Sequence, residues 1–311
     1  MEPFTPDQFK LAFQLWMSGC WILFTILMSM ELLARVVGWW TSRRSAQPRP
    51  LFPADWPANF ALFWHSGILM GVVGIAVIYG GMQLAHQITP FRIPFTAATV
   101  LLYYLAADFC NYVEHRFAHE VRFFWADHSI HHSAESYNFT LTYRLPPLHW
   151  LNEAMPYAAF ALMGFDPTWM LLMKSVGIFQ FFIHTDRIGR LGLFDHIFCS
   201  PANHQVHHAR NPIYVDKNYG SSLLIWDKLF GTFQLPTDER VRFGITHRVT
   251  TGNPFKIWVA EFRLLFIDFA HAPGFTEKLK VLLGRPGETF EYHAADSTAR
   301  PLPPSRLAAA E

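Results

Sequence analysis

Residues 105–132 read LAADFCNYVEHRFAHEVRFFWADHSIHH and connect an apolar segment to two closely spaced groups of histidines. His115 and His119 are four residues apart, and a helix places such side chains on one face, where both imidazoles can bind one metal ion. Asp108 and Tyr112 extend the same stripe toward the apolar segment. The spacing therefore predicts a helix that emerges from an apolar layer with this stripe facing a site.

Two histidine clusters share the spacing HxxHH, and they read His128-Ser-Ile-His131-His132 and His204-Gln-Val-His207-His208. In each cluster, the first two histidines are predicted to lie on one helical turn, and the third, rotated by about 100°, is predicted to reach a second metal ion. With His184 added, the predicted metal ligands are His115, His119, His128, His131, His132, His184, His204, His207 and His208. These are more ligands than one closed tetrahedral site uses, so we expect a binuclear centre. Imidazole ligands leave iron, zinc, copper and nickel open.

Acidic residues near the clusters are candidates for hydrogen bonding to metal-bound imidazoles. They are Asp108, Glu114, Glu120, Asp127, Glu135, Asp186 and Asp195. Position favours Asp108 and Glu120 among them, and these two are the predicted catalytic acids. Five of the histidines outside the clusters are predicted to be structural or surface residues, and these five are His149, His196, His247, His271 and His293. Motifs for a serine hydrolase, a zinc protease of the HExxH type, a dinucleotide site and a P-loop are absent from the sequence.

The composition indicates a membrane protein. Hydrophobic residues make up 51% of the 311 residues, charged residues make up 16%, and the mean hydropathy is +0.14. The net charge of +1 and the lack of a basic block argue against a nucleic-acid partner. The three cysteines are far apart in the sequence, which excludes an iron–sulfur cluster held by cysteines alone.

Two apolar stretches are long enough to cross a bilayer as helices, residues 11–30 and residues 60–84. Between them, Arg43, Arg44 and Arg49 follow a Trp-Trp pair, a pattern typical of an interface and a cytoplasmic loop. A third helix is predicted to start in residues 95–107 and to return toward this loop. The histidine clusters are therefore expected on the cytoplasmic side of the membrane.

The rest of the chain completes the predicted fold. Residues 155–164 and 168–182 are expected to form a tilted or re-entrant hairpin broken at an Asp-Pro pair, and residues 255–269 to form an amphipathic interfacial helix. We predict an all-α fold: a multi-pass membrane helical bundle with a cytoplasmic-side, histidine-rich helical cap that holds a binuclear metal site. One domain is expected over residues 1–291, with its histidine core in about 95–235, followed by a disordered tail at 292–311.

At the three histidine motifs the sequence resembles the fatty acid hydroxylase and sterol desaturase superfamily, and within it the alkylglycerol monooxygenases. The strings that carry this resemblance are Asp108-Phe109, His115-Arg116, His119-Glu120, His131-His132-Ser133, His184-Thr185, Asp216-Lys217-Asn218-Tyr219-Gly220, Trp226-Asp227 and Phe230-Gly231-Thr232-Phe233. The resemblance implies that the nine histidines bind two non-haem iron ions and that Glu120 is an essential acid beside them. The segment Leu145-Pro146-Pro147 departs from the ether-lipid enzymes.

The resemblance implies an O₂-dependent oxidoreductase that hydroxylates a membrane lipid at an ether-lipid, fatty-acyl, sterol or other C–H bond. The alternatives are a sterol or fatty-acyl desaturase and, outside the enzymes, a divalent-metal membrane transporter, which would place ligands at mid-bilayer depth. The chain has no haem or flavin motif, so the expected partners are the lipid, O₂ and an external electron donor: a reduced pterin, a ferredoxin or a cytochrome. The expected location is the bacterial inner membrane or the endoplasmic reticulum.

Overall fold

A computed structural model describes residues 6–44, 51, 55–246, 249 and 251–287. Within these residues the regular secondary structure is helical, and β-structure is limited to isolated bridges. The helices are α1 (Pro6–Ser42), α2 (Trp56–Leu69), η1 (Met70–Gly74), α3 (Ile75–Ile88), α4 (Val100–Glu120), α5 (Arg122–His132), η2 (Phe139–Tyr143), α6 (His149–Leu162), α7 (Pro167–Val176), η3 (Gly177–Ile183), η4 (Gly192–His196), α8 (Pro201–His207), α9 (Ile225–Phe230), α10 (Pro254–His271) and α11 (Gly274–Leu283). The predicted all-α class is confirmed. The predicted tail and the residues Arg49, His247 and His293 lie outside the described part.

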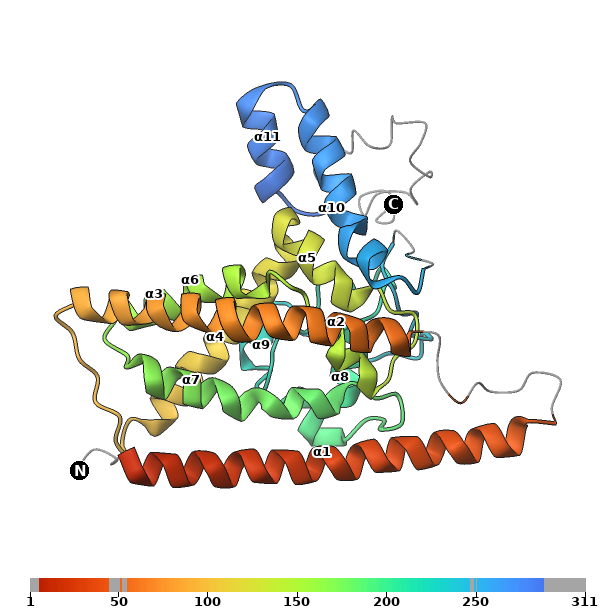
Figure 1. Cartoon of the computed structure of the whole chain (residues 1–311), viewed down its shortest axis with the longest axis horizontal. Helices are drawn as coiled ribbons and strands as arrows, with labels where there is room; N and C mark the ends of the chain where they lie inside the picture. Colours follow the sequence, from red (N-terminus) through yellow and green to blue (C-terminus); the bar gives the residue numbers. More distant parts are fainter. Residues whose placement is uncertain (1–5, 45–50, 52–54, 247–248, 250, 288–311) are drawn as a thin grey trace.

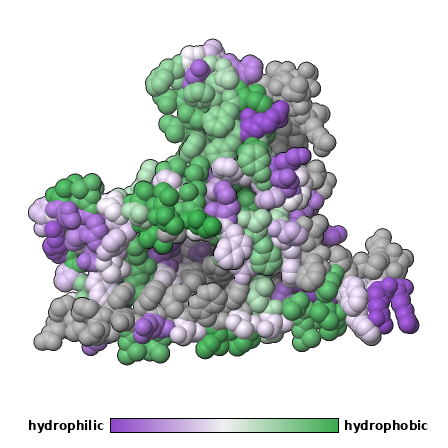
Figure 2. Space-filling view, viewed as in Figure 1, coloured by the Kyte–Doolittle hydropathy of each residue, from purple (hydrophilic) through white to green (hydrophobic). Residues whose placement is uncertain are grey.

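One segment of the described chain is long and apolar enough to cross a membrane. It runs over Trp56–Ile88, where α2, η1 and α3 follow one another, with a mean hydropathy of 2.0. This segment contains the predicted second span, and α1 covers the residues predicted as the first. Figure 1 shows the axes of α1, the α2–α3 segment and α7 lying roughly parallel, with the chain in α2–α3 running opposite to that in α1, and Figure 2 shows hydrophobic residues at several places on the surface. The multi-pass arrangement and its cytoplasmic cap stay predictions.

Helix α4 lies at the centre of the bundle and packs against α5, α6 and α7, while α3 packs against α6. Tyr103 illustrates why this core is stable, because its ring is fully buried between Phe95 and Phe165 while its hydroxyl donates to the Ile93 carbonyl at 2.6 Å. Burying an aromatic ring contributes stability only if its polar end finds a partner. The core thus holds the first half of α4 firmly and leaves its second half to carry His115 and His119.

Two breaks in the helices turn the chain back on itself. Val121 has an extended backbone (φ −108°, ψ 118°) between α4 and α5, so the helix that carries His119 ends and a new one carries His128. The second break is the predicted one, where Asp166 caps α7 by accepting from the Thr168 amide at 2.9 Å and proline stands at the first helical turn. The predicted third helix starts later than expected, at Val100.

A buried arginine joins the apolar segment Trp56–Ile88 to the second histidine cluster. The Arg144 guanidinium is almost fully buried, and it donates to the Ile130 carbonyl at 2.8 Å, to Ser133 Oγ at 2.8 Å and to Asn59 Oδ1 at 3.3 Å. Burial lowers the pKa of Arg144 to about 10. Its hydrogen bonds therefore fix the end of α5 against α2.

Replacing Arg144 with Ala is expected to lower the free energy of unfolding by about 2–3 kcal/mol, because buried acceptors lose their donor. The measurement is the midpoint of thermal unfolding in detergent. Arg263→Ala removes an arginine that is exposed and serves as the matched control. Equal midpoints for both variants would contradict the structural role of Arg144.

Candidate metal centre

Four parts of the chain bring the predicted metal ligands together. Helix α4 carries His115 and His119, and α5 carries the second cluster. Helix α8 begins at Pro201 after Ser200, whose hydroxyl accepts from the Asn203 amide at 3.3 Å, and this cap fixes the start of the helix that carries the third cluster. His184 follows the 3₁₀ turns of η3. Residues from across the sequence thus converge on one place.

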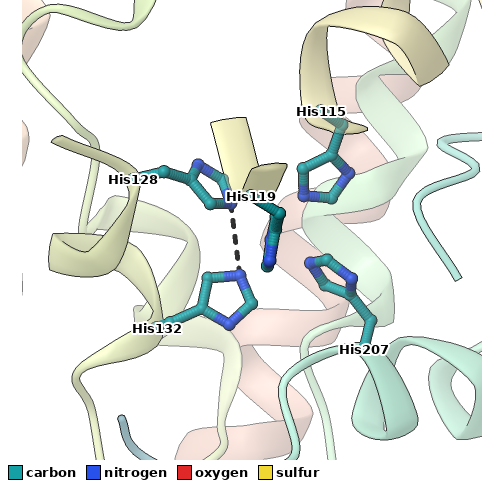
Figure 3. A group of neighbouring side chains, drawn as sticks. All are labelled: His115, His119, His128, His132 and His207. Atoms are coloured by element: carbon teal, nitrogen blue, oxygen red, sulfur yellow. Dashed lines mark hydrogen bonds between the residues drawn. The ribbon is translucent and has the colours of Figure 1, made fainter. Parts of the chain in front are cut away.

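The nine histidines form two groups of nitrogen atoms, and within each group these atoms lie within 4.8 Å of one another. The five-histidine group consists of His115, His119, His128, His132 and His207, and the four-histidine group consists of His131, His184, His204 and His208. Figure 3 shows the rings of the five-histidine group pointing toward a common centre. The groups adjoin, since the rings of His132 and His208 stack with their centroids 4.3 Å apart.

The structure corrects the predicted division of each HxxHH cluster. The first and third histidines share a group, as His128 and His132 do, and the middle histidine, His131, belongs to the other group. The third cluster repeats this pattern with the groups exchanged. The reason is helical geometry, because positions i and i+4 differ by about 40° around a helix whereas i and i+3 differ by about 60°. Each cluster therefore bridges the two groups.

The spacing of the nitrogen atoms fits shared metal ions. His128 Nε2 and His132 Nε2 lie 3.2 Å apart, as do His184 Nε2 and His131 Nε2, while His204 Nε2 and His184 Nε2 lie 2.9 Å apart. Two imidazole nitrogens bound to one ion at about 2.1 Å, with tetrahedral to octahedral angles, lie about 3.0–3.4 Å apart. Without an ion, a cluster of buried imidazoles leaves nitrogen atoms unsatisfied, which is costly.

Burial keeps these imidazoles in the neutral form that binds metals. It lowers the pKa of His115 and of His184 to about 4, because the charged form loses its hydration. His207 shows most directly that these histidines fit a bound metal ion. Its Nδ1 hydrogen bonds to the Lys217 carbonyl oxygen at 3.0 Å, and its Nε2 is buried without a hydrogen-bond partner among the described residues. A free, inward nitrogen opposite an anchored one is the arrangement of a metal-bound histidine.

A single loop orients two members of the five-histidine group by hydrogen bonds and lies near a third. Besides the Lys217 carbonyl at His207, the Tyr219 carbonyl oxygen lies 2.9 Å from His115 Nδ1, and an oxygen of Asp216 lies 3.8 Å from His119 Nδ1. In the four-histidine group, the Gln180 carbonyl oxygen lies 3.0 Å from His184 Nδ1. Such outer partners fix the ring and its tautomer. The loop 216–220 therefore serves the five-histidine group in particular.

Buried side chains hold this loop in an unfavourable conformation. Asp216 and Asn218 have positive φ angles of 59° and 56°, which is uncommon for residues other than glycine. Asn218 donates to the Gln234 carbonyl at 2.7 Å and to the Asn203 carbonyl at 3.1 Å. Asp227 accepts from the Tyr219 amide at 2.8 Å. These hydrogen bonds offset the backbone strain and set the carbonyls that face the histidines.

Gly220→Ala is expected to lower metal content and thermal stability together. A Cβ at this position would lie 2.5 Å from the Leu223 carbonyl oxygen and 2.6 Å from Asp227 Oδ2, so the loop would have to shift. Overpacking of this kind costs about 1–3 kcal/mol. Gly189→Ala is the matched control, because a Cβ there meets no atom within 4 Å. Unchanged iron content in Gly220→Ala would contradict the role of the loop.

The two predicted catalytic acids lie outside both histidine groups. Asp108 is buried and accepts from the Ser222 amide at 3.1 Å and from Trp226 Nε1 at 2.9 Å. Glu120 forms ion pairs with Arg116 and Arg285, each at 3.1 Å. In the structure, both carboxylates connect α4 to later segments of the chain. Their catalytic roles stay predictions.

Three of the other predicted acids contact groups apart from the nine histidines. Glu114 lies 3.2 Å from His149 Nδ1, Asp127 accepts from the Leu148 amide at 3.1 Å, and Asp195 accepts from the Leu191 amide at 2.6 Å. The hydrogen bonds of His115, His184 and His207 to groups outside the histidines are with backbone carbonyls. Sequence reasoning missed these partners because every residue has a carbonyl. The sequence signal for the two carbonyls at Lys217 and Tyr219 is the string 216–220, which resembles the alkylglycerol monooxygenases.

Comparisons with known proteins find a family match over the segment that carries the nine histidines. The family model described as fatty acid hydroxylase matches residues 100–232, which include all nine histidines. The alkylglycerol monooxygenase of Xenopus tropicalis is 39% identical over 186 residues, covering 60% of this chain and 42% of that protein. The alkylglycerol monooxygenase of Caenorhabditis elegans is 32% identical over 79% of this chain and 50% of that protein. The predicted resemblance is confirmed.

Other relatives act on other lipids according to their names. An ornithine lipid hydroxylase of Rhizobium tropici is 31% identical over 50% of this chain and 48% of that protein, and fungal sterol desaturases match at 25–26% identity. The chain spans about half the length, or less, of these relatives. No solved structure matches the chain significantly.

Proposed function

Because residues 100–232 match the fatty acid hydroxylase model, we propose that this chain is an O₂-dependent di-iron oxidoreductase that hydroxylates a membrane lipid. The observation that carries the proposal is the division of nine histidines, seven of them buried and two half-buried, into two adjoining groups. A closed zinc site uses four ligands, so two groups of this size fit a pair of ions. Iron is proposed because it suits imidazole ligands and oxidises C–H bonds with O₂.

The chemistry assigns distinct tasks to the metals and to the protein. Two iron ions, when bound, would supply the electron transfer that lets O₂ oxidise an unactivated C–H bond. One oxygen atom enters the lipid as a hydroxyl group, and the other leaves as water with two protons and two electrons. The nine histidines hold the ions as neutral ligands, and their burial excludes bulk water. The loop 216–220 keeps two of the rings, those of His115 and His207, oriented.

The electrons have to come from outside this chain. We propose a separate donor, which is a reduced pterin, a ferredoxin or a cytochrome, since the sequence has no haem or flavin motif. The proposed location is a membrane crossed several times, the bacterial inner membrane or the endoplasmic reticulum, with the histidines at the cytoplasmic side. The apolar segment Trp56–Ile88 supports membrane insertion. The names of the relatives support a lipid substrate.

Desaturation is the second candidate, and the matches to sterol desaturases favour it. The two reactions share removal of a first hydrogen, and they differ in whether oxygen or a second hydrogen loss follows. They therefore require the same metal centre. The mass of the product separates them.

The test uses the full chain purified in detergent. Bound iron and zinc are measured by mass spectrometry, and lipid extracts are then incubated with the iron-loaded protein, ¹⁸O₂ and a chemical reductant. The proposal expects two iron ions per chain and a lipid product that gains one ¹⁸O atom. Loss of two hydrogens without oxygen would favour the desaturase. Tight zinc that yields no oxidised lipid after iron loading would exclude both reactions.

A further inference from the structure

Helices α10 and α11 form a hairpin whose inner face is fixed beside the histidines. Phe262, Leu265 and Val281 of the hairpin pack in one apolar cluster with Ala126 of α5. The ion pair between Arg122 and Asp268 is buried. The Arg122 amide donates to the Gly284 carbonyl at 3.0 Å, and Arg285 pairs with Glu120. The hairpin is thus tied to the turn between α4 and α5, which joins the first two histidine clusters.

The outer face of α11 is an unpartnered apolar stripe. Phe275, Leu279 and Leu283 are spaced four residues apart, so they align along one side of the helix. Their exposed fractions are 76%, 38% and 60%. On α10, Phe255 and Phe266 are also exposed. Large exposed apolar stripes of this kind indicate a surface that another molecule or a membrane covers.

The charges around the stripe indicate what covers it. Within residues 254–285, all of which the structure describes, every charged side chain that is classed as exposed is basic: Lys256, Arg263, Lys280 and Arg285. The acids of the hairpin are buried or half-buried, and Asp268 and Glu277 are paired with Arg122 and Lys280. A basic helix with an exposed apolar stripe fits a lipid leaflet that contains anionic headgroups.

The orientation of the hairpin also fits a lipid leaflet that covers the stripe. Figure 1 shows α10 and α11 projecting from the body and running crosswise to α2–α3, the segment long enough to span a membrane. Helices crosswise to a spanning segment run parallel to the membrane plane, as helices docked on a membrane surface do. Figure 2 shows hydrophobic residues over this projection. A second copy of the chain fits less well, because a symmetric contact through the stripe would bring two basic rims together.

We propose that the α10–α11 hairpin docks on the membrane surface, with Phe275, Leu279 and Leu283 inserted in the acyl boundary and its basic residues at anionic phosphate groups. The proposal rests on the membrane-bound function proposed above. Docking sets the depth of the histidine groups, since Arg122 and Glu120 tie the hairpin to the turn that precedes His128. A lipid carbon would therefore meet the metal centre at a fixed height above the leaflet.

The test measures the depth of spin labels on the full chain in lipid nanodiscs. Labels are placed by Leu279→Cys in the stripe, by Asp238→Cys in an exposed loop and by Val77→Cys in the spanning segment, and the unmodified chain gives the background from its own cysteines. The discs contain phosphatidylcholine alone or with phosphatidylglycerol. Collision with O₂ reports lipid contact, and collision with a water-soluble nickel chelate reports water contact.

The Leu279 label is expected to collide with the nickel chelate about tenfold less often than the Asp238 label, as insertion in the acyl boundary requires. Protection of the Leu279 label from the nickel chelate should increase when the discs contain phosphatidylglycerol. Lys256→Gln together with Arg263→Gln should remove that increase. Equal nickel collision at Leu279 and Asp238 would overturn the proposal. Spin–spin broadening between Leu279 labels would identify a second copy as the occupant and would also overturn it.

The Val77 label separates this proposal from the proposed function. If Val77 is in lipid and Leu279 is in water, the chain spans the membrane without docking its hairpin, and the lipid hydroxylase proposal is unaffected. If Val77 is also in water, the membrane-bound function itself fails. The measurement requires neither bound iron nor substrate, so loss of iron during preparation does not change its outcome.

Discussion

His131→Ala and His132→Ala are expected to remove different metal ions although the two residues are adjacent in the chain. His131 belongs to the four-histidine group and His132 to the five-histidine group. Each variant should retain about one ion per chain after dialysis against a chelator. Lipid oxidation should fall by at least about 100-fold, since even loss of an outer partner of a ligand costs 10–100-fold. Iron per chain is measured by mass spectrometry.

Double variants turn this division into a sharper test. His131→Ala with His204→Ala removes two ligands of the same group and should still retain one ion. His131→Ala with His132→Ala should retain none. A variant with His128→Ala and His131→Ala separates the two divisions. The pairing predicted from the sequence puts these two residues on one ion and expects the other ion to be retained, whereas the structure puts them in different groups and expects no retained ion. His271→Ala is the control, since His271 is exposed and lies outside both groups.

Asp227→Ala is expected to destabilise the protein and to empty the five-histidine group first. The fully buried carboxylate accepts from the Tyr219 amide at 2.8 Å, from the Gly220 amide at 2.7 Å and from Thr232 Oγ1 at 2.7 Å. Removing it leaves three donors unsatisfied, each at about 1–3 kcal/mol. We expect a loss of about 3 kcal/mol or more, which corresponds to a fall of roughly 6–12 °C in the unfolding midpoint.

The metal content of the Asp227 variant distinguishes positioning from general destabilisation. The loop 216–220 contacts the five-histidine group through the Tyr219 and Lys217 carbonyls, whereas His184 of the other group is anchored at Gln180. Below its unfolding midpoint, the variant should therefore retain about one ion. Asp238→Ala, in the exposed loop, is the control for loss of an acidic residue. Simultaneous loss of both ions in proportion to unfolding would contradict the positioning role.

The positions of Glu120 and Arg144 show what sequence reasoning could not supply. Glu120 follows a metal-ligand candidate directly, which suggested a catalytic acid, yet its carboxylate pairs with Arg116 and with Arg285, a residue far along the chain. Arg144 carried no prediction, and it proves to be among the most buried side chains of the protein. Both contacts depend on segments that come together only when the helices pack.

The sequence by itself determined the helical class, the break at Asp166, the amphipathic helix α10 and the nine candidate ligands, because each depends on the spacing of neighbouring residues. Only the tertiary structure decided how the histidines divide into two groups and which atoms orient them. The Tyr219 carbonyl lies 104 positions from His115 and has no side-chain signature. Local periodicity can be recognised from the residue types along the chain, whereas contacts between distant backbone atoms form only when the chain has packed.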